Sequence, residues 1–292
     1  MEGKADQLVE EAEKSLKGFS LSKYFGGDKY EKAHGKFIQA ATQYKACSNY
    51  AKAAKAYVRA AEMSMASKNE VDVTAELEDA ARCHVKANDK DAATRLYRQV
   101  AEYYERNQMH IRAAKTCVSL SEITEGSAKI KWLEKASTYY RMQGSRVSAD
   151  ELIQKVAEAK ARMGDYKGAH ELYEQLARET LNDAVMRGGA RRLFFMALLT
   201  QLAGITRENF MEDLAALRER FEEYQDLDTQ FDHLTREHML VQGVIEAMEV
   251  ESVEKMEEAI ADYDNICVLD ELKEKMLLRA KRALVGRLDD LR

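Results

Sequence analysis

Residue types that commonly catalyse reactions or bind metals are scattered along this chain. Its 292 residues include six histidines and four cysteines. No two histidines are four residues apart, the spacing that puts a metal-binding pair on one helix face, and no cysteine pair has zinc-site spacing. Phosphate-binding loops of the form GxxxxGKS or GxxxxGKT and GxSxG nucleophile elbows do not occur. The sequence therefore predicts a binding protein, without catalytic site, cofactor or metal, rather than an enzyme.

One segment near the start combines bulky apolar side chains with glycines and lysines. It reads FSLSKYFGGDKY over residues 19–30, in a predicted loop at 18–30. Its apolar members are Phe19, Leu21, Tyr24 and Phe25. Aromatic side chains favour the membrane interface, and Lys23 and Lys29 can meet anionic headgroups. Two interpretations stay open: the loop touches a membrane, or these side chains pack the first helix onto the second.

The C-terminal part of the chain is acidic, whereas the N-terminal part is slightly basic. Residues 1–180 hold 30 basic and 27 acidic side chains, and the remainder holds 15 and 24. One acidic run is interrupted by a single cation, Lys255, and consists of Glu246, Glu249, Glu251, Glu254, Glu257, Glu258, Asp262 and Asp264. The chain then reads RLDDLR over 287–292. This pattern predicts a basic partner for the C-terminal part, and the alternative for the last residues is a frayed polar tail.

The elements that position these residues are expected to be helices. Apolar residues make up 46% of the chain and charged residues 33%, and proline is absent. Proline breaks helix interiors but is common in loops, so its absence indicates helices joined by very short turns. No run of 18 apolar residues occurs, and the cysteines follow no disulfide pattern. We therefore expect a cytoplasmic protein that spans no membrane.

An internal repeat organises the N-terminal part. Three stretches align without gaps: AATQYKACSNYAKAAKAY (40–57), AARCHVKANDKDAATRLY (80–97) and VAEAKARMGDYKGAHELY (156–173). The recurring positions are Ala41, Ala81 and Ala157, then Ala53, Ala93 and Ala169, then Tyr57, Tyr97 and Tyr173. Each copy predicts a helix, a short turn and a second helix, with small residues where helices approach closely. Such pairs must stack to bury their apolar faces, which predicts a tetratricopeptide-like solenoid over 1–180.

The repeat fades near residue 180, where the Gly188–Gly189 pair marks a break. Apolar stretches at helical spacing follow: LFFMALL (193–199), FMEDLAALRERF (210–221), HMLVQGVIEAM (238–248) and KMLLRAKRALV (275–285). They predict a C-terminal helical bundle over 181–292, with an acidic tail. The expected fold class is all-α, a helical-hairpin solenoid followed by a helical bundle.

The repeat also suggests an arrangement of basic residues. With a unit offset of 40 residues, Lys115 and Lys155 are expected at equivalent positions, and so are Arg106 and Arg146. Equivalent positions in a solenoid line up on one face, which suits an acidic, rod-like partner. The alternative is an ordinary solvated face. Each exposed ion pair contributes only about 0.2–1 kcal/mol, so such binding should be salt-sensitive and need several copies.

Several of these segments together resemble a known family. They are the YFGG loop (24–27), RAAKTC around Lys115, LIQKVA around Lys155, LFFMALL, DYDNICVLDELKEKMLLRAKR (262–282) and the terminal LDDLR. In this order and spacing, the chain resembles the alpha-type soluble NSF attachment protein (alpha-SNAP) family over nearly its whole length. The resemblance implies an adaptor that wraps in several copies around a SNARE four-helix bundle. It also implies recruitment and stimulation of NSF, a hexameric AAA ATPase that takes the bundle apart.

The resemblance also implies roles for particular residues. Lys115 and Lys155 would contact SNAREs, and Phe19, Leu21, Tyr24 and Phe25 would touch the membrane. The implied ATPase contacts are Glu246, Glu249, Glu251, Asp289, Asp290 and Leu291, with Leu291 linked to stimulation of ATP turnover.

The chain departs from the family pattern at three places. Glu151 stands where the family has a SNARE-facing lysine, Ser20 replaces one of two loop phenylalanines, and Gly286–Arg287 interrupts a more acidic tail. We therefore expect contacts that are weaker or differently distributed. The alternative function is another tetratricopeptide-like scaffold, such as a cochaperone that clamps a terminal carboxylate. The asparagine and lysine set for such a clamp cannot be assembled from this sequence.

Overall fold

The computed structural model describes residues 2–17, 26–232 and 234–290, and within these ranges the regular elements are helical. The first seven helices are α1 (Glu2–Lys17), α2 (Gly26–Ala46), α3 (Tyr50–Ala66), α4 (Glu70–Lys86), α5 (Lys90–Arg106), α6 (His110–Ile123) and α7 (Gly126–Met142). The others are α8 (Arg146–Met163), α9 (Tyr166–Leu181), α10 (Ala190–Gly204), α11 (Phe210–Leu227), α12 (Arg236–Glu249), α13 (Val253–Asp264) and α14 (Glu271–Asp290). A 3-10 turn, η1 (Arg187–Gly189), precedes α10. The predicted all-α class is confirmed.

The chain divides into two compact units, Met1–Ala149 and Asp150–Arg292, and the division falls inside α8. The division predicted from the repeat, at 180/181, marks a different event. There α9 ends at Leu181 and the helix-pair pattern gives way to the bundle. The second unit thus holds the last helix pair of the repeat together with the bundle helices.

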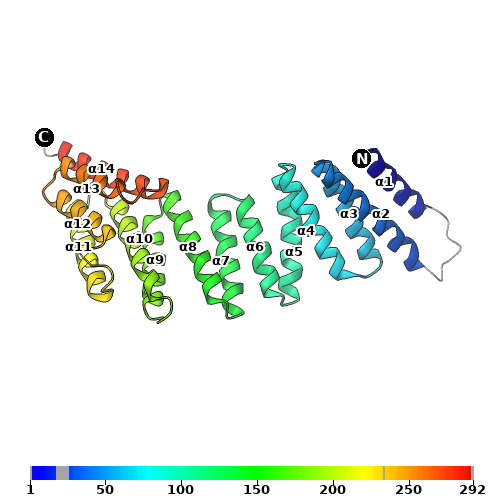
Figure 1. Cartoon of the computed structure of the whole chain (residues 1–292), viewed down its shortest axis with the longest axis horizontal. Coiled ribbons are helices and arrows are strands. Elements are labelled where there is room, and N and C mark those ends of the chain that lie inside the picture. The colour runs from blue at the N-terminus through cyan, green and yellow to red at the C-terminus, as the bar shows by residue number, and fades with distance from the viewer. Residues whose placement is uncertain (1, 18–25, 233, 291–292) are drawn as a thin grey trace. The chain divides into compact units, whose positions relative to one another are not determined.

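Consecutive helices of the first unit alternate in direction (Figure 1), and the α2–α3, α3–α4, α4–α5, α5–α6 and α7–α8 turns share nearly the same geometry. One residue of each such turn has left-handed backbone, with φ of 58° at Ser48, 60° at Asn88 and 55° at Gln108. The residue after it donates its N–H to a carbonyl five positions back, as Asp89 does to His84 at 2.9 Å. This is a helix C-cap of the Schellman type, which satisfies carbonyls at the helix end. The predicted NDK and GDY turns lie at such caps, where the Asp89 and Asp165 carboxylates also accept the N–H of Ala92 and Gly168.

Alanine and tyrosine fill the seams between helices as the repeat predicts. The six recurring alanines are fully buried, and the three recurring tyrosines are at most 5% exposed: Ala41, Ala53, Ala81, Ala93, Ala157, Ala169, Tyr57, Tyr97 and Tyr173. Helices approach closely where the side chain is a methyl group, and the tyrosine ring occupies the wider space beside it.

The spacing of the repeat changes in the middle of the chain. α4 begins at Glu70 and α6 at His110, 40 residues later, but α8 begins at Arg146, only 36 residues after α6. α6 has 14 residues, fewer than its neighbours, and only two residues join it to α7. This repeat unit is therefore four residues shorter, and α8 must be aligned with α6 at an offset of 36 residues.

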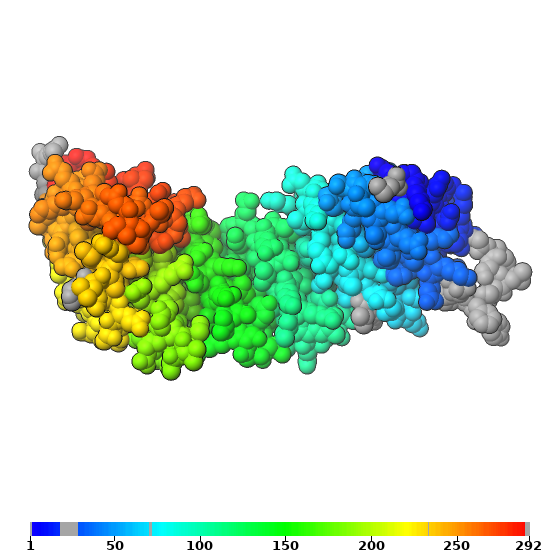
Figure 2. Space-filling view, viewed as in Figure 1, coloured from blue at the N-terminus to red at the C-terminus, as the bar shows by residue number. Residues whose placement is uncertain are grey.

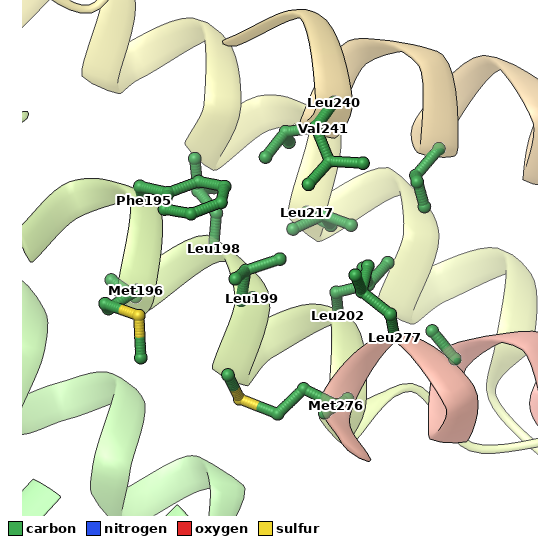
Figure 3. Close-up of a cluster of buried hydrophobic side chains, with 14 of the residues drawn as sticks. Phe195, Met196, Leu198, Leu199, Leu202, Leu217, Leu240, Val241, Met276 and Leu277 are labelled. Atoms are coloured by element: carbon green, nitrogen blue, oxygen red, sulfur yellow. The ribbon is translucent and has the colours of Figure 1, made fainter. Parts of the chain in front are cut away.

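The second unit is built around α10. Buried side chains lie on every side of this helix, among them Phe194, Phe195, Leu198, Leu199 and Leu202. Leu217 of α11, Leu240 and Val241 of α12, and Met276 and Leu277 of α14 pack in the same cluster (Figure 3). The apolar stretch LFFMALL therefore forms the central helix of the predicted bundle. Ala157 of α8 and Tyr173 of α9 belong to this cluster too, which explains why the second unit begins in α8. None of the described helices is both long enough and apolar enough to span a bilayer.

Candidate interaction surfaces

Lys115 lies on a groove in the first unit. The groove has a volume of about 430 Å³ and is lined by side chains of α4, α5 and α6, among them Arg82, Tyr97, Tyr104, Arg112, Lys115 and Thr116. Arg112 lies over the Tyr104 ring, 5.8 Å from its centroid, and the Arg82 guanidinium contacts the Asp79 carboxylate at 2.8 Å. Three cations, several hydroxyl groups and one carboxylate, that of Glu78, line this depression, so its net charge is positive and suits carboxylate side chains of a partner.

Two of these cations were not predicted. Arg112 precedes Lys115 by three residues, so helical spacing alone places both side chains on one face of α6. Arg82 comes from α4, and no sequence pattern pairs it with Lys115. Only the stacking of α4, α5 and α6 brings Arg82 to the groove.

The predicted equivalence of Lys115 with Lys155 is wrong, because the offset between α6 and α8 is 36 residues. Buried Ala113, Leu120 and Ser121 of α6 match buried Ala149, Val156 and Ala157 of α8 at that offset. At the same offset Lys115 matches Glu151, and Lys155 matches Ser119.

Lys155 nevertheless lies on the face of α8 that corresponds to the Lys115 face of α6. Ser119 lies one helical turn after Lys115 and lines the same groove. Lys155 therefore lies one turn beyond the position of α8 that matches Lys115. Its side chain is exposed in the second unit. The Glu151 side chain, one turn earlier, is exposed as well.

The predicted equivalence of Arg106 with Arg146 is also wrong. Arg106 is the last residue of α5, while Arg146 is the first residue of α8. By the offset of 36 residues, Arg106 matches Met142 at the end of α7. Both arginines are exposed at helix ends, and Arg106 contacts Glu102 at 3.4 Å. Neither lines the Lys115 groove.

Four residues of the acidic run line a second groove, between α12 and α13, together with the cations Arg236 and Lys255. Its volume is about 940 Å³, and Glu246, Glu249, Glu258 and Asp262 are among its lining residues. The Glu249 carboxylate accepts two bonds from the Arg218 guanidinium, at 2.5 and 2.7 Å, and these bonds raise the pKa of Arg218. Glu246 accepts a bond from the Gln242 amide at 2.8 Å.

Glu251 connects this groove to the last helix. It occupies the α12–α13 turn with left-handed backbone, φ 53°, and its carboxylate lies 3.6 Å from the Arg287 guanidinium of α14. The exposed Asp289 follows two residues later on α14. The structure thus brings the end of α14 beside the acidic turn, which the sequence could not specify. Asp290 ends α14, and nothing is described of its side chain.

Several predicted residues lie outside the described ranges. They are Phe19, Leu21, Tyr24, Phe25 and Leu291. Within the described ranges, no group of three or more histidine, cysteine, aspartate or glutamate side chains is placed to hold a metal ion. Cys83 and Cys117 are buried, and burial raises the pKa of Cys117 to about 11, so its thiol is protonated near neutral pH.

Comparison with known proteins decides the family. A family model described as soluble NSF attachment protein, SNAP, matches residues 3–285. The chain belongs to the soluble NSF attachment protein family. The predicted resemblance is therefore confirmed, and it covers both compact units.

Several named relatives are similar to nearly the whole of this chain. The alpha-soluble NSF attachment protein of Mus musculus is 29% identical, over 100% of this chain and 98% of the relative. The beta-soluble NSF attachment protein of Bos taurus is 29% identical, over 98% and 95%. A probable vesicular-fusion protein sec17 homolog of Schizosaccharomyces pombe is 26% identical, over 98% of each chain. The names of these relatives denote attachment to NSF and a part in vesicle fusion.

Proposed function

We propose that this family member is an adaptor for the disassembly of SNARE complexes, without enzymatic activity of its own. It binds the SNARE four-helix bundle, recruits the hexameric AAA ATPase NSF and stimulates its ATP turnover. The observation that carries this proposal is family membership over both units, joined to two surfaces of different charge.

The SNARE contact is assigned to cations of both units. In the first unit, Lys115 shares its groove with Arg82 and Arg112. In the second unit, Lys155 is exposed on the corresponding face of α8. Arg106 and Arg146 lie outside the groove and contribute, in this proposal, only through longer-range attraction. Because exposed ion pairs are weak, binding relies on several cations per copy and several copies per bundle.

The ATPase contact is assigned to the α12–α13 groove and the end of α14. Glu246, Glu249 and Glu251 supply negative charge there, and the Glu251–Arg287 contact keeps α14 alongside. Asp289, Asp290 and Leu291 are assigned to the same contact because the resemblance implies that role for them. A basic surface of the ATPase fits it by charge.

The membrane contact is assigned to the loop at 18–30, with Phe19, Leu21, Tyr24 and Phe25 as its apolar members. In this proposal the protein is cytoplasmic and associates peripherally with membranes through this loop.

A pull-down from lysate depleted of ATP tests the proposal. The immobilised chain should retain SNAREs together with an AAA ATPase, and ATP with magnesium should release both. Lys115→Glu with Lys155→Glu should reduce SNARE retention at least tenfold, because each change replaces attraction by repulsion.

The matched control carries Lys129→Glu and Lys167→Glu, which change two exposed lysines, one in each unit, by the same charge. Equal retention of SNAREs by the Lys115/Lys155 variant and this control would refute the SNARE assignment. Retention of SNAREs without any ATPase would refute the adaptor role.

A further inference from the structure

One edge of the first unit gathers exposed apolar side chains. Because the helices alternate in direction, α3, α5 and α7 end at the same edge where α4, α6 and α8 begin (Figure 1). Six large apolar side chains are exposed among the described residues of this unit. Five of them lie at that edge: Met65, Met109, Ile111, Met142 and Val147. Only Val85 lies at the opposite edge. Single exposed apolar residues are ordinary, but their concentration at one edge points to a surface that covers them.

Two corners of this edge are also purely basic. They are the α5–α6 corner, RNQMHIR over 106–112, and the α7–α8 corner, RMQGSRV over 141–147. Their only charged residues, with histidine counted as neutral, are Arg106, Arg112, Arg141 and Arg146. We refer to these two corners as the basic–apolar edge. They lie along the lower border of the first unit in the view of Figure 2.

No described corner of the opposite edge combines purely basic charge with exposed large apolar side chains: the α2–α3 corner, 45–52, is purely basic but has no exposed large apolar side chain. The α4–α5 corner, 85–91, and the α6–α7 corner, 122–129, mix acidic and basic residues. Asp89 and Asp91 lie in the first of these corners, and Glu122 and Glu125 in the second. The combination of arginine with exposed methionine, isoleucine and valine is therefore particular to one edge.

The two corners are firmly held. Met109 donates its N–H to the Tyr104 carbonyl at 2.8 Å, and Ser145 donates to that of Tyr140 at 2.9 Å. The His110 ring at the first corner stacks on Tyr139 of α7, with centroids 5.7 Å apart. The apolar side chains thus project from hydrogen-bonded caps, with exposed fractions of 37% at Met109 and 62% at Met142.

We propose that the basic–apolar edge rests on an anionic lipid surface, as a contact additional to the loop at 18–30. Arginines meet the headgroups while the four apolar side chains enter the interfacial layer. The described residues that flank the loop, Lys17 at the end of α1 and Gly26 at the start of α2, lie at the same edge of the unit.

The charges favour lipid over a second copy of the chain. Edge-to-edge pairing of two copies would set the four arginines of one against those of the other, which is unfavourable. Pairing with the opposite edge would offer the apolar side chains little but Val85. A fluid anionic surface accepts scattered side chains without complementary pockets.

Vesicle flotation with the full chain, without SNAREs or ATPase, tests the proposal. The edge variant carries Met109→Ser, Ile111→Ser, Met142→Ser and Val147→Ser. Its partitioning onto vesicles of phosphatidylcholine with phosphatidylserine should fall about tenfold, since four apolar anchors are lost. A control with Val85→Ser, Met211→Ser, Val268→Ser and Leu278→Ser removes four exposed apolar side chains elsewhere and should partition like the parent. Circular dichroism should show equal helix content in both.

Further arms separate the edge from the loop and from other partners. A loop variant, Phe19→Ser with Phe25→Ser, should keep part of its vesicle binding and lose it when combined with the edge variant. Complete loss in the loop variant alone, or unchanged binding in the edge variant, would overturn the proposal. So would concentration-dependent self-association of the free chain that only the edge variant abolishes. SNARE binding in solution should survive in the edge variant, so that failure here and failure of the adaptor role remain distinguishable.

Discussion

The contact between α12 and α13 depends on a glycine at its centre. A Cβ added at Gly243 would lie 2.9 Å from the Cβ of Ala259, whereas ordinary contacts begin at 3.4 Å. In a Gly243→Ala variant, α13 must therefore move outward by about half an ångström, and overpacking of this kind costs about 1–3 kcal/mol. Alanine regains about 0.5–1 kcal/mol over glycine in a helix. We expect a net loss of about 1 kcal/mol.

Hydrogen exchange read by mass spectrometry measures this loss locally. Peptides of α12 and α13 should exchange about fivefold faster in Gly243→Ala, because 1 kcal/mol corresponds to about that factor. Adding Ala259→Gly should restore part of the protection, since it removes the clashing methyl group.

The matched control is Gly35→Ala in α2, where an added Cβ meets nothing within 4 Å. That change should slow exchange in α2 through helix propensity alone. If Gly243→Ala slows exchange as Gly35→Ala does, close packing is not what requires glycine at this position.

Two further predictions concern buried residues. Glu76 of α4 is buried, accepts bonds from the Ser64 hydroxyl at 2.9 and 3.1 Å and contacts His34, and burial raises its pKa. Stability from this raised pKa is fully present below the ordinary glutamate pKa and is lost as pH rises through the raised one. As pH rises above the ordinary glutamate pKa of about 4, the unfolding free energy of Glu76→Gln, measured by urea titration, should therefore fall less than that of the parent. Parallel pH profiles of the two would contradict this. Phe194→Ala, at a fully buried position of α10, should cost about 3–5 kcal/mol in thermal unfolding, whereas Met211→Ala, 58% exposed, should change it by less than about 0.5 kcal/mol. Similar losses of unfolding free energy in the two variants would contradict the central place of α10 in the bundle.

Local features of the fold were readable from the sequence because their causes are short-range. The absence of proline, the repeated alanines such as Ala53 and Ala93, and the NDK and GDY turns specify helices, close seams and caps within a few residues of one another. Asp89 and Asp165 cap the helices that follow them, by bonds three residues long. Repetition of these signals predicted the stacked helix pairs.

The register of the basic residues was predicted wrongly, for an equally physical reason. A single offset of 40 residues was carried through the repeat, but the short α6 and the two-residue turn after it reduce the offset to 36. The recurrence of Tyr103–Tyr104 as Tyr139–Tyr140 already has the shorter spacing. Four residues make about one helical turn. The shorter offset therefore matches Lys115 with Glu151 and places Lys155 one turn beyond that matching position.

What the sequence by itself determined is the fold class, the helix pairs, the caps and the family, since each rests on residues near one another or on order along the chain. The tertiary structure alone decided that Arg82 joins Lys115, that Arg287 of α14 meets Glu251, and that the exposed methionines of the first unit collect at one of its edges. These are contacts or alignments between helices far apart in sequence. They depend on helix lengths and on how successive helices stack, and no local pattern encodes the sum of those effects.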